Sequence, residues 1–477
     1  MKRALFFVYL VTHFIEMVRV ARVLRDAGGY QCVFLFAHRY AASSRDIEIC
    51  LHEGFGCIDE AGEAITAGDA QIERARPGIM QRIARTISGA TFPELCLGIL
   101  FPRLPAWTSN YRAEMRRSGS IMNSIAPSVL VLPEDSVEFA TPSLVLAARD
   151  RAIPSVIVPF TISNAEESAE ARWHDPVFWL TRWRNWIVGT LSPHWVREHR
   201  GRKLLALAGE RALAMEMVGL APPQPWVVNS GRANAIAVES PFMEKYYLAS
   251  GLPREQLVVT GALYDDLLAA RLARRDEHRA ALVRKLALDP AKPILVCALP
   301  PDQSDTRRPN VEFSSFNELL RAWGRALANA RGFNVVLVHH PRTSRSDIEF
   351  LRTEFGLRIA DDVIVDLIPA CDVYAAYASA TIRLAIACGT PVIHYDCHRF
   401  HYSDYLDVPG VVTTYDLGGF KQRLAELSDP VTRETLAARQ RRFTQEANIL
   451  DGRAGERMLK LVDGLASAAG TSPELRA

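Results

Sequence analysis

Residues 334–342 read NVVLVHHPR, and residues 373–393 read VYAAYASATIRLAIACGTPVI. Each stretch begins with a short apolar run, which is typical of a strand buried on both faces of a parallel sheet. The second stretch continues through small residues into a helical pattern that ends at Gly389, and Pro391 opens a further run of strand length. This alternation predicts an α/β fold with helices on both faces of the sheet.

The same alternation extends over the rest of the chain. In the second half, further strands are predicted at residues 233–238, 257–260, 293–299, 363–366 and 411–414. In the first half, strands are predicted at 4–10, 31–36, 128–132 and 155–159, with helices at 15–27 and 136–151. Two Rossmann-like domains account for this pattern.

Prolines indicate where the two domains are joined. Three of them lie within residues 222–225, and proline stiffens a connection because it cannot continue a helix. We therefore expect an N-terminal domain at residues 1–224, with an arginine-rich helical insertion at 70–118, and a C-terminal domain at 225–447. Residues 448–477 are expected to form a closing helix and a tail.

Composition and charge limit the classes of function. With 49% hydrophobic residues, the chain of 477 residues can bury large cores. Its 56 Lys and Arg residues balance 54 Asp and Glu residues, so no overall field points to nucleic acid as a partner. The eight cysteines are scattered, as reduced thiols of a cytoplasmic protein are. No apolar run is long enough to span a bilayer, and residues 4–10 are interpreted as a strand rather than as part of a signal peptide.

Candidate catalytic residues follow predicted strands of the first half, where open parallel sheets bind their ligands. His13 lies between the strand at 4–10 and the next helix, although a histidine there can also serve packing alone. Glu134 and Asp135 follow another strand, and a carboxylate in that place can remove a proton from a substrate hydroxyl. The alternative is that Asp135 or Ser136 caps the next helix.

Candidate ligand-binding residues follow the strand at 334–339. His340 comes directly before Pro341, which forces an extended backbone and directs the imidazole outward. Arg342 and Thr343 then provide a cation and a hydroxyl, which suit a phosphate group. The pattern therefore favours contact with a phosphorylated ligand over a role in packing.

Two more strand ends complete this set. Ser379, Ala380 and Thr381 begin a helix whose free N–H groups can bind phosphate oxygens, and their small side chains let the backbone approach a ligand. Glu239 and Ser240 follow an earlier strand, where Ser240 can cap the next helix and Glu239 can reach the ligand. No G-x-G-x-x-G loop follows the first strand and no Asp-x-Asp motif stands at a matching strand end, so neither a dinucleotide cofactor nor a metal is expected.

Taken in order, several short motifs resemble those of a known group. They are His340-Pro341, Ser379-Ala380-Thr381, Gly389-Thr390-Pro391-Val392, Glu239-Ser240-Pro241-Phe242 and Val258-Val259-Thr260-Gly261. They look like motifs of GT-B proteins of bacterial surface-polysaccharide assembly, which include capsule and lipopolysaccharide glycosyltransferases, polyglycerolphosphate transferases and sugar-nucleotide 2-epimerases. The resemblance covers roughly residues 235–415 and implies two Rossmann-like domains that face each other across a cleft.

The resemblance also implies roles for the candidates. Those of the second half, from Glu239 to Thr381, would hold the nucleotide and phosphates of a sugar donor, and an acidic residue of the first domain would act as base. Many UDP-sugar enzymes and the epimerases carry a glutamate in the helix before the Gly-x-Pro step, where this chain has Arg383 and Leu384. That departure favours a CMP- or CDP-linked donor.

Three functional hypotheses follow. The first is a metal-independent glycosyltransferase of bacterial surface glycan synthesis, which moves a sugar from a CMP-, CDP- or UDP-linked donor to a saccharide or glycolipid acceptor and needs no further cofactor. In it, Glu134, Asp135 or His13 would activate the acceptor. The second is a hydrolysing or non-hydrolysing sugar-nucleotide 2-epimerase. The third is a non-catalytic nucleotide-binding scaffold.

One aromatic and basic stretch remains, at residues 173–203. Its tryptophans are Trp173, Trp179, Trp183, Trp186 and Trp195, and arginines are interleaved with them. Such a stretch can dock on an anionic membrane surface or surround the sugar rings of an acceptor. The alternative is a pair of helices that packs its aromatic rings on the domain. The first interpretation implies a cytoplasmic protein that is peripheral to the inner face of the cytoplasmic membrane.

Overall fold

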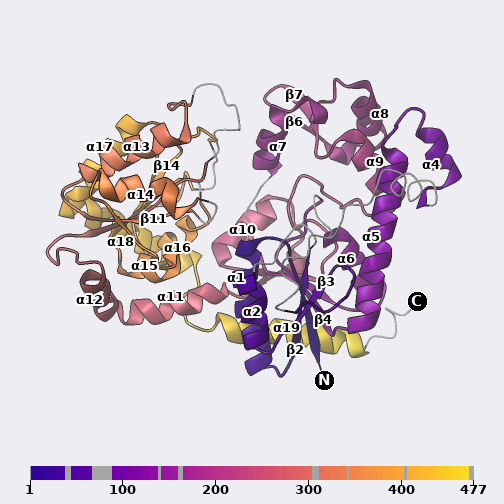
Figure 1. The fold of residues 1–477 in the computed structure, drawn as a ribbon, viewed down its shortest axis with the longest axis horizontal. Helices are drawn as coiled ribbons and strands as arrows, with labels where there is room; N and C mark the ends of the chain where they lie inside the picture. The colour runs from indigo at the N-terminus through magenta and orange to yellow at the C-terminus, as the bar shows by residue number, and fades with distance from the viewer. Residues whose placement is uncertain are drawn as a thin grey trace. The chain divides into compact units, whose positions relative to one another are not determined.

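The computed structural model describes residues 2–37, 44–66, 89–137, 141–159, 165–302, 311–340, 343–377, 379–401 and 405–471. The chain divides into two compact units, each with its own parallel sheet (Figure 1). Unit 1 comprises Met1–Glu239, Met243–Leu263 and Gly455–Ala477, and unit 2 comprises Ser240–Phe242 and Tyr264–Ala454.

Unit 1 is built on a seven-stranded sheet in the order β3-β2-β1-β4-β5-β8-β9. Its strands are β1 (Arg3–Val8), β2 (Gln31–Phe36), β3 (Gly56–Asp59), β4 (Val129–Leu132), β5 (Ser155–Ile157), β8 (Ala235–Val238) and β9 (Leu257–Val259). All neighbours pair in parallel, and β4 is buried along its whole length. Continuous apolar runs of this kind fit a sheet that is covered on both faces.

The helices of this sheet come from distant parts of the chain. They are α1 (Val11–Asp26), α2 (Ser44–His52), α5 (Leu104–Ile125), α6 (Thr141–Arg149), α10 (Pro241–Ala249) and α19 (Ala454–Thr471). On α19, Asp463 accepts hydrogen bonds from Lys2 (2.7 Å) and from the hydroxyl of Tyr30 (2.8 Å). Leu459 of the same helix packs on Gly28, where a Cβ atom would come within 2.6 Å of it. The last described helix therefore belongs to the first unit.

Unit 1 also has a second hydrophobic core beside its sheet. Around it lie α4 (Phe92–Leu97), α7 (Ala165–Trp173), α8 (Trp183–Leu191), α9 (Gly209–Met217) and an antiparallel hairpin of β6 (Val196–His199) and β7 (Arg202–Leu205). Trp195, Leu204 and Leu205 are fully buried in this core. The stretch at 173–203 thus contains one α-helix, α8, and ends in the β6–β7 hairpin. It is not the pair of helices that one of the two interpretations expected.

Unit 2 is built on a six-stranded parallel sheet in the order β12-β11-β10-β13-β14-β15. Its strands are β10 (Ile294–Ala298), β11 (Asn334–Val338), β12 (Arg358–Ile359), β13 (Val373–Ala376), β14 (Val392–Tyr395) and β15 (Val411–Thr414). Its helices are α11 (Leu263–Ala273), α12 (Arg275–Lys285), α13 (Phe316–Ala328), α14 (Arg345–Thr353), α15 (Ile364–Leu367), α16 (Ile382–Ala387), α17 (Leu417–Ser428) and α18 (Pro430–Ala447). Ser315, Ser344, Asp416 and Asp429 cap four of them.

Two features differ from the expectations. β8 and β9 extend the first sheet, because Val156 of β5 pairs with Ala235 of β8. The chain therefore does not change units at residue 225, where the boundary was expected. It leaves unit 1 after Glu239, returns to it at Met243 and leaves it again after Leu263. The strand predicted at 363–366 is instead the short helix α15, since so short an apolar run fits either structure.

Candidate functional site

The candidate acids of unit 1 lie where the strand order of its sheet reverses. From β1 the chain proceeds to β2 on one side, and β4 lies on the other. Ligands of open α/β sheets bind beside the carboxyl ends of the two strands at such a point. Tyr9 follows β1, and its buried hydroxyl donates a hydrogen bond to Glu134, which follows β4. The rings of Tyr9 and His13 pack edge to face, with their centroids 4.5 Å apart.

Tyr9 therefore connects His13 and Glu134, which are far apart in the sequence. Tyr9 was not among the predicted residues, although its place at the end of the first strand was a signal that could have identified it. His13 is fully buried in the first turn of α1. Burial lowers the pKa of its imidazole to about 4, so the ring is neutral at pH 7.

Asp135 is fixed by a loop that approaches from residues 229–231. Its backbone N–H donates to Oδ1 of Asn229, and the N–H of Asn229 donates to the carbonyl of Asp135, both at 2.8 Å. Gly231 lies so close that a Cβ atom there would be 1.4 Å from Oδ2 of Asp135. Burial raises the pKa of Asp135 to about 6, although a hydrogen bond from Thr141 opposes the shift. A carboxylate with a pKa near neutrality suits general base catalysis.

The alternative role of Asp135 or Ser136 in capping stays a prediction, because α6 is described from Thr141 onward and residues 138–140 lie outside the described residues. The N–H of Ser136 donates to the hydroxyl of Thr141 at 3.1 Å, and that hydroxyl donates to the carbonyl of Ser136 at 3.2 Å.

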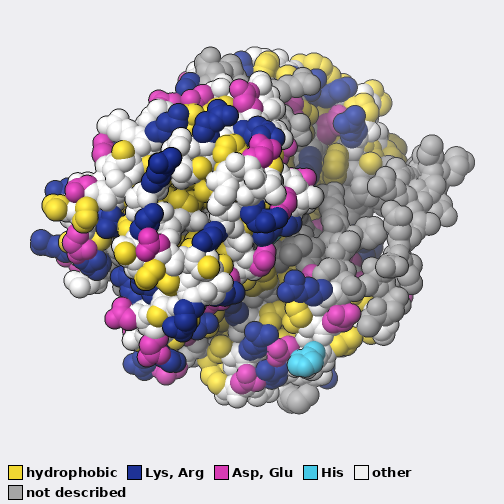
Figure 2. Space-filling model, turned by 60° about the vertical axis from the view of Figure 1, so that its left-hand side comes forward, with side chains coloured by type: hydrophobic (Ala, Val, Ile, Leu, Met, Phe, Trp, Pro, Cys, Tyr) yellow, Lys and Arg dark blue, Asp and Glu magenta, His cyan; other side chains and the backbone are white. Residues whose placement is uncertain are grey.

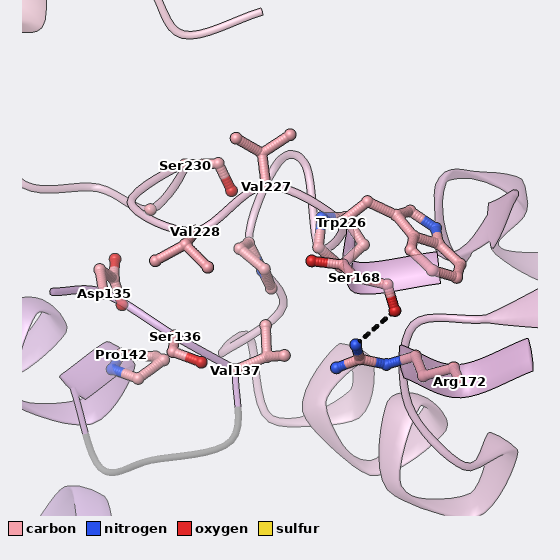
Figure 3. A pocket seen from close by; sticks show the side chains of 13 residues that line it. Asp135, Ser136, Val137, Pro142, Ser168, Arg172, Trp226, Val227, Val228 and Ser230 are labelled. Carbon is pink, nitrogen blue, oxygen red and sulfur yellow. Dashed lines mark hydrogen bonds between the residues drawn. The ribbon is translucent and has the colours of Figure 1, made fainter. Parts of the chain in front are cut away.

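A small cavity of about 30 Å³ lies next to Asp135 within unit 1. Figure 3 shows Asp135 on one side of it and Trp226 and Arg172 on the other. Arg172 donates to the carbonyl of Ser168 at 2.8 Å and to that of Ala206 at 2.7 Å. A volume of this size is enough for a water molecule.

In unit 2, the strand order reverses between β10 and β13. Ser379 and Thr381 follow β13, and their hydroxyl oxygens are 2.8 Å apart. The hydroxyl of Thr381 also forms a hydrogen bond with Tyr374, a buried residue of β13. Thr381 is thus held by the sheet, and Ala380 lies partly exposed between it and Ser379.

His340 is partly exposed just after β11, the neighbour of β10. Its carbonyl accepts a hydrogen bond from the N–H of Thr343 at 2.8 Å. Thr343 is buried. Pro341 and Arg342 lie outside the described residues.

Glu239 and Ser240 are placed differently from these candidates. Both are buried at the end of β8, a strand of the first sheet. Glu239 closes a segment of unit 1, and Ser240 opens a segment of unit 2. Their expected position after a strand of the second sheet is therefore not observed.

A second polar loop of unit 2, which is not among the candidate site residues, follows β14. Asp396 follows β14, and its carboxylate accepts hydrogen bonds from the N–H groups of Phe400 (3.0 Å) and His401 (2.6 Å). The loop places the ring of His398 5.1 Å from that of Tyr377, which follows β13. An aspartate directly after a strand was the available signal.

Two further properties concern metals and membranes. Within the described residues, no group of His, Cys, Asp and Glu side chains is arranged to hold a metal ion. No helix in the same part of the chain is both long and apolar enough to cross a bilayer. On the face shown in Figure 2, basic and acidic side chains are interspersed rather than gathered by sign.

No protein-family model matches the sequence, and no curated protein is similar to it in sequence. Solved structures are similar in fold. CalG4, the calicheamicin glycosyltransferase, is 11% identical with a TM-score of 0.53, and the match covers 98% of each chain. The glycosyltransferase VinC in complex with dTDP is 14% identical with a TM-score of 0.51, over 98% of this chain and 100% of VinC.

An epimerase is similar to the same degree. UDP-GlcNAc 2-epimerase from Neisseria meningitidis, bound to UDP-GlcNAc, is 11% identical with a TM-score of 0.51, over 97% of this chain and 100% of the epimerase. The chain has a GT-B fold. The prediction of two Rossmann-like domains is confirmed, and in this GT-B chain each domain carries candidate residues at the reversal of its strand order.

Proposed function

We propose that the protein is a metal-independent glycosyltransferase that uses a nucleotide-activated sugar. The proposal includes a CMP-, CDP- or UDP-linked donor and a saccharide or glycolipid acceptor of bacterial surface glycan synthesis. The proposal rests on the positions of the candidate site residues in a chain with a GT-B fold. Acids and a histidine follow β1 and β4 in unit 1, and a histidine and hydroxyls follow β11 and β13 in unit 2.

The residues of unit 2 would bind the donor. Ser379, Thr381 and Thr343 provide hydroxyl donors for phosphate oxygens, and the imidazole of His340 and the guanidinium of Arg342 add further donors. These groups would stabilise the negative charge that develops on the leaving nucleotide as the bond to the sugar breaks.

The residues of unit 1 would activate the acceptor. A carboxylate takes the proton of the acceptor hydroxyl, the oxygen forms a bond to the anomeric carbon of the donor, and the nucleotide leaves with the electron pair of the broken bond. Asp135 is the proposed base because its pKa of about 6 is close to neutrality. Glu134, which accepts a hydrogen bond from Tyr9, would orient the same hydroxyl, and the ring of Tyr9 also contacts His13.

A panel of CMP, CDP, UDP and GDP titrated into the protein by calorimetry tests the donor site. We expect His340→Ala and Arg342→Ala each to weaken the affinity for the preferred nucleotide by about tenfold or more, as the loss of a charge-assisted hydrogen bond does. His52→Ala, which changes an exposed histidine of α2, is the control. Unchanged affinity in both variants would remove this strand end from the donor site.

The similarity to the epimerase of Neisseria meningitidis makes 2-epimerisation the second candidate function. The composition of α16 speaks against it, because the helix reads IRLAIA and has no glutamate where relatives bind the ribose. Arg383 instead donates to the carbonyl of Ala380 at 3.3 Å, and Leu384 is buried. Conversion of a nucleotide sugar to its epimer without any acceptor would decide for the epimerase.

A further inference from the structure

Large apolar side chains are exposed on the elements that surround the second core of unit 1. Phe92 of α4 and Ile99 just after it are 78% and 83% exposed, and on α8 Trp183, Trp186 and Leu191 are 52%, 59% and 69% exposed. Together with the exposed Leu100, these residues are called the apolar surface below. Isolated exposed apolar residues are common, but a group of this kind marks a contact site.

The two parts of the apolar surface lie side by side, although α4 and α8 are far apart in the sequence. Nε of Arg184 donates to the carbonyl of Leu100 at 2.8 Å. The rings of Phe101 and Trp183 are 6.2 Å apart. Trp183 and Trp186 are three residues apart on α8 and therefore point to the same side. Figure 1 shows both helices at the same end of the long helix α5.

The exposed part of α4 is held rigidly rather than frayed. Thr91 and Glu94 form a capping box at its start. The buried carboxylate of Glu94 accepts hydrogen bonds from Arg112 of α5, one of them at 2.7 Å. Gly98 ends the helix against Pro105, where a Cβ atom would be 2.9 Å from the proline ring. The fold thus supports a projection whose outer side chains remain in water.

In the two segments that carry the apolar surface, the exposed charged side chains are basic. Across residues 89–107 and 182–192 the single acidic residue is Glu94, which is paired with Arg112. Arg103 and Arg182 are exposed in these segments. The guanidinium carbon of Arg184 lies 4.9 Å from the centroid of the Trp183 ring. Nε of the same arginine is 3.8 Å from the carboxylate of Glu210. Exposed tryptophans and arginines around apolar side chains fit the interface of an anionic bilayer.

We propose that the apolar surface docks unit 1 on an anionic lipid bilayer. Phe92, Ile99, Trp183 and Trp186 enter the boundary between headgroups and acyl chains, and Arg103 and Arg182 contact lipid phosphates. The surface differs from the stretch predicted from sequence, because Trp195 of that stretch is buried and α4 lies outside it. The inference also bears on the acceptor, and in that respect it rests on the proposed function. If unit 1 binds the acceptor, its docking on a bilayer favours a glycolipid over a soluble saccharide.

Co-sedimentation with vesicles tests the docking on the full chain. We expect the protein to bind vesicles of phosphatidylcholine and phosphatidylglycerol at least tenfold more tightly than vesicles of phosphatidylcholine alone, because the cationic residues contact anionic lipid. The double variants Phe92→Ser/Ile99→Ser and Trp183→Ser/Trp186→Ser should each lose tenfold or more of that binding. The matched control is Val363→Ser/Val431→Ser, which changes two exposed valines of unit 2 and should bind as the unaltered chain does.

Cys96 provides a second, local measurement. It lies on α4 and is the exposed one of the eight cysteines. A polarity-sensitive fluorophore attached there should shift to the blue when anionic vesicles are added, and the shift should disappear in Trp183→Ser/Trp186→Ser. This second expectation holds only if α4 and α8 enter the bilayer as one surface.

Three results would overturn the proposal. They are equal binding of all variants, no binding of the unaltered chain to either vesicle, and a dimer in solution that Phe92→Ser/Ile99→Ser dissociates, which would assign the surface to a second copy. Calorimetry with CDP and UDP on the same variants separates this inference from the proposed function. Vesicle binding without nucleotide binding would count against the transferase alone, and nucleotide binding without vesicle binding against the docking alone.

Discussion

Asp135 illustrates how individual residues form the candidate site. Its carboxylate rests against the backbone of Gly231, and its main chain is held on both sides by Asn229. The carboxylate is therefore fixed in position before any substrate binds. A side chain at residue 231 would occupy the place that Oδ2 of Asp135 takes.

Gly231→Ala should accordingly displace Asp135. We expect the variant to lose about 1–3 kcal/mol of unfolding free energy, as overpacked sites do, and to lose most of the proposed transfer activity. Gly464→Ala on α19 is the control, because a Cβ atom there meets no neighbour within 4 Å. Urea denaturation and a transfer assay measure both effects, and an active, fully stable Gly231→Ala protein would contradict the expectation.

The raised pKa of Asp135 predicts a dependence of stability on pH. Because its pKa rises from 3.8 to about 6, the native state binds this proton more tightly than the unfolded chain does. Its unfavourable contribution is present above pH 6 and disappears as the pH falls toward 4. Relative to Asp135→Asn, the unaltered protein should thus gain up to about 3 kcal/mol between pH 7 and pH 4.

Urea denaturation of both proteins across this range measures the difference. Asp463→Asn is the control of opposite sign, because the hydrogen bond from Lys2 lowers the pKa of Asp463. Relative to that variant, the unaltered protein should lose stability as the pH falls. In each comparison the difference in unfolding free energy between the unaltered protein and the variant is followed as a function of pH. If this difference changed with pH in the same direction for Asp135→Asn and Asp463→Asn, Asp135 would not be the titrating group.

At the scale of elements, α4 depends on one ion pair. A helix of this length is not stable alone, so the bond between Glu94 and Arg112 fixes it on α5. Burial raises the pKa of Glu94, but hydrogen bonds from Arg112 and Thr91 outweigh burial and bring it to about 2. The carboxylate therefore stays charged at pH 7 and needs its partner.

Arg112→Met should consequently destabilise the protein more than the double variant Glu94→Gln/Arg112→Met does. The single change leaves a buried charge without its partner, which costs about 3–5 kcal/mol in buried pairs, whereas the double change removes both charges. We also expect Cys96 to react faster with a thiol reagent in Arg112→Met. Thermal unfolding compares the two variants, and equal stability would mean that the pair does not hold α4.

The sequence predicted elements better than it predicted their neighbours. β2 has the predicted bounds, because Gly28 and Gly29 end the preceding helix and so limit the apolar run on that side. β8 was assigned to the wrong sheet because pairing with β5 depends on residues far away in the sequence. For the same reason the contact between Tyr9 and Glu134 could not be predicted, although both stand at strand ends. The β6–β7 hairpin was missed because its charged strands do not alternate.

At the scale of the whole molecule, unit 1 is assembled from three separate parts of the chain. β8 and β9 complete the edge of its sheet, and α19 contacts Lys2, just before β1, and Gly28 and Tyr30, in the turn before β2. Its stability therefore depends on residues at the far end of the sequence. Unit 2, apart from residues Ser240–Phe242, is one continuous segment.

Removal of α19 should destabilise unit 1 alone. In a chain that ends at residue 453, we expect the amides of β1 and β2 to exchange with deuterium faster, while those of β10 and β13 keep their protection. A chain that ends at residue 471 is the control. Equal exchange in both units would show that α19 does not hold unit 1.

The position of α19 also has a consequence for synthesis on the ribosome. Residues Tyr264–Ala454 emerge before Gly455 and the residues that follow it. Unit 1 is therefore completed only after the whole of unit 2 has been synthesised, although most of unit 1 is translated first. Until then the apolar residues that α19 covers remain accessible to chaperones.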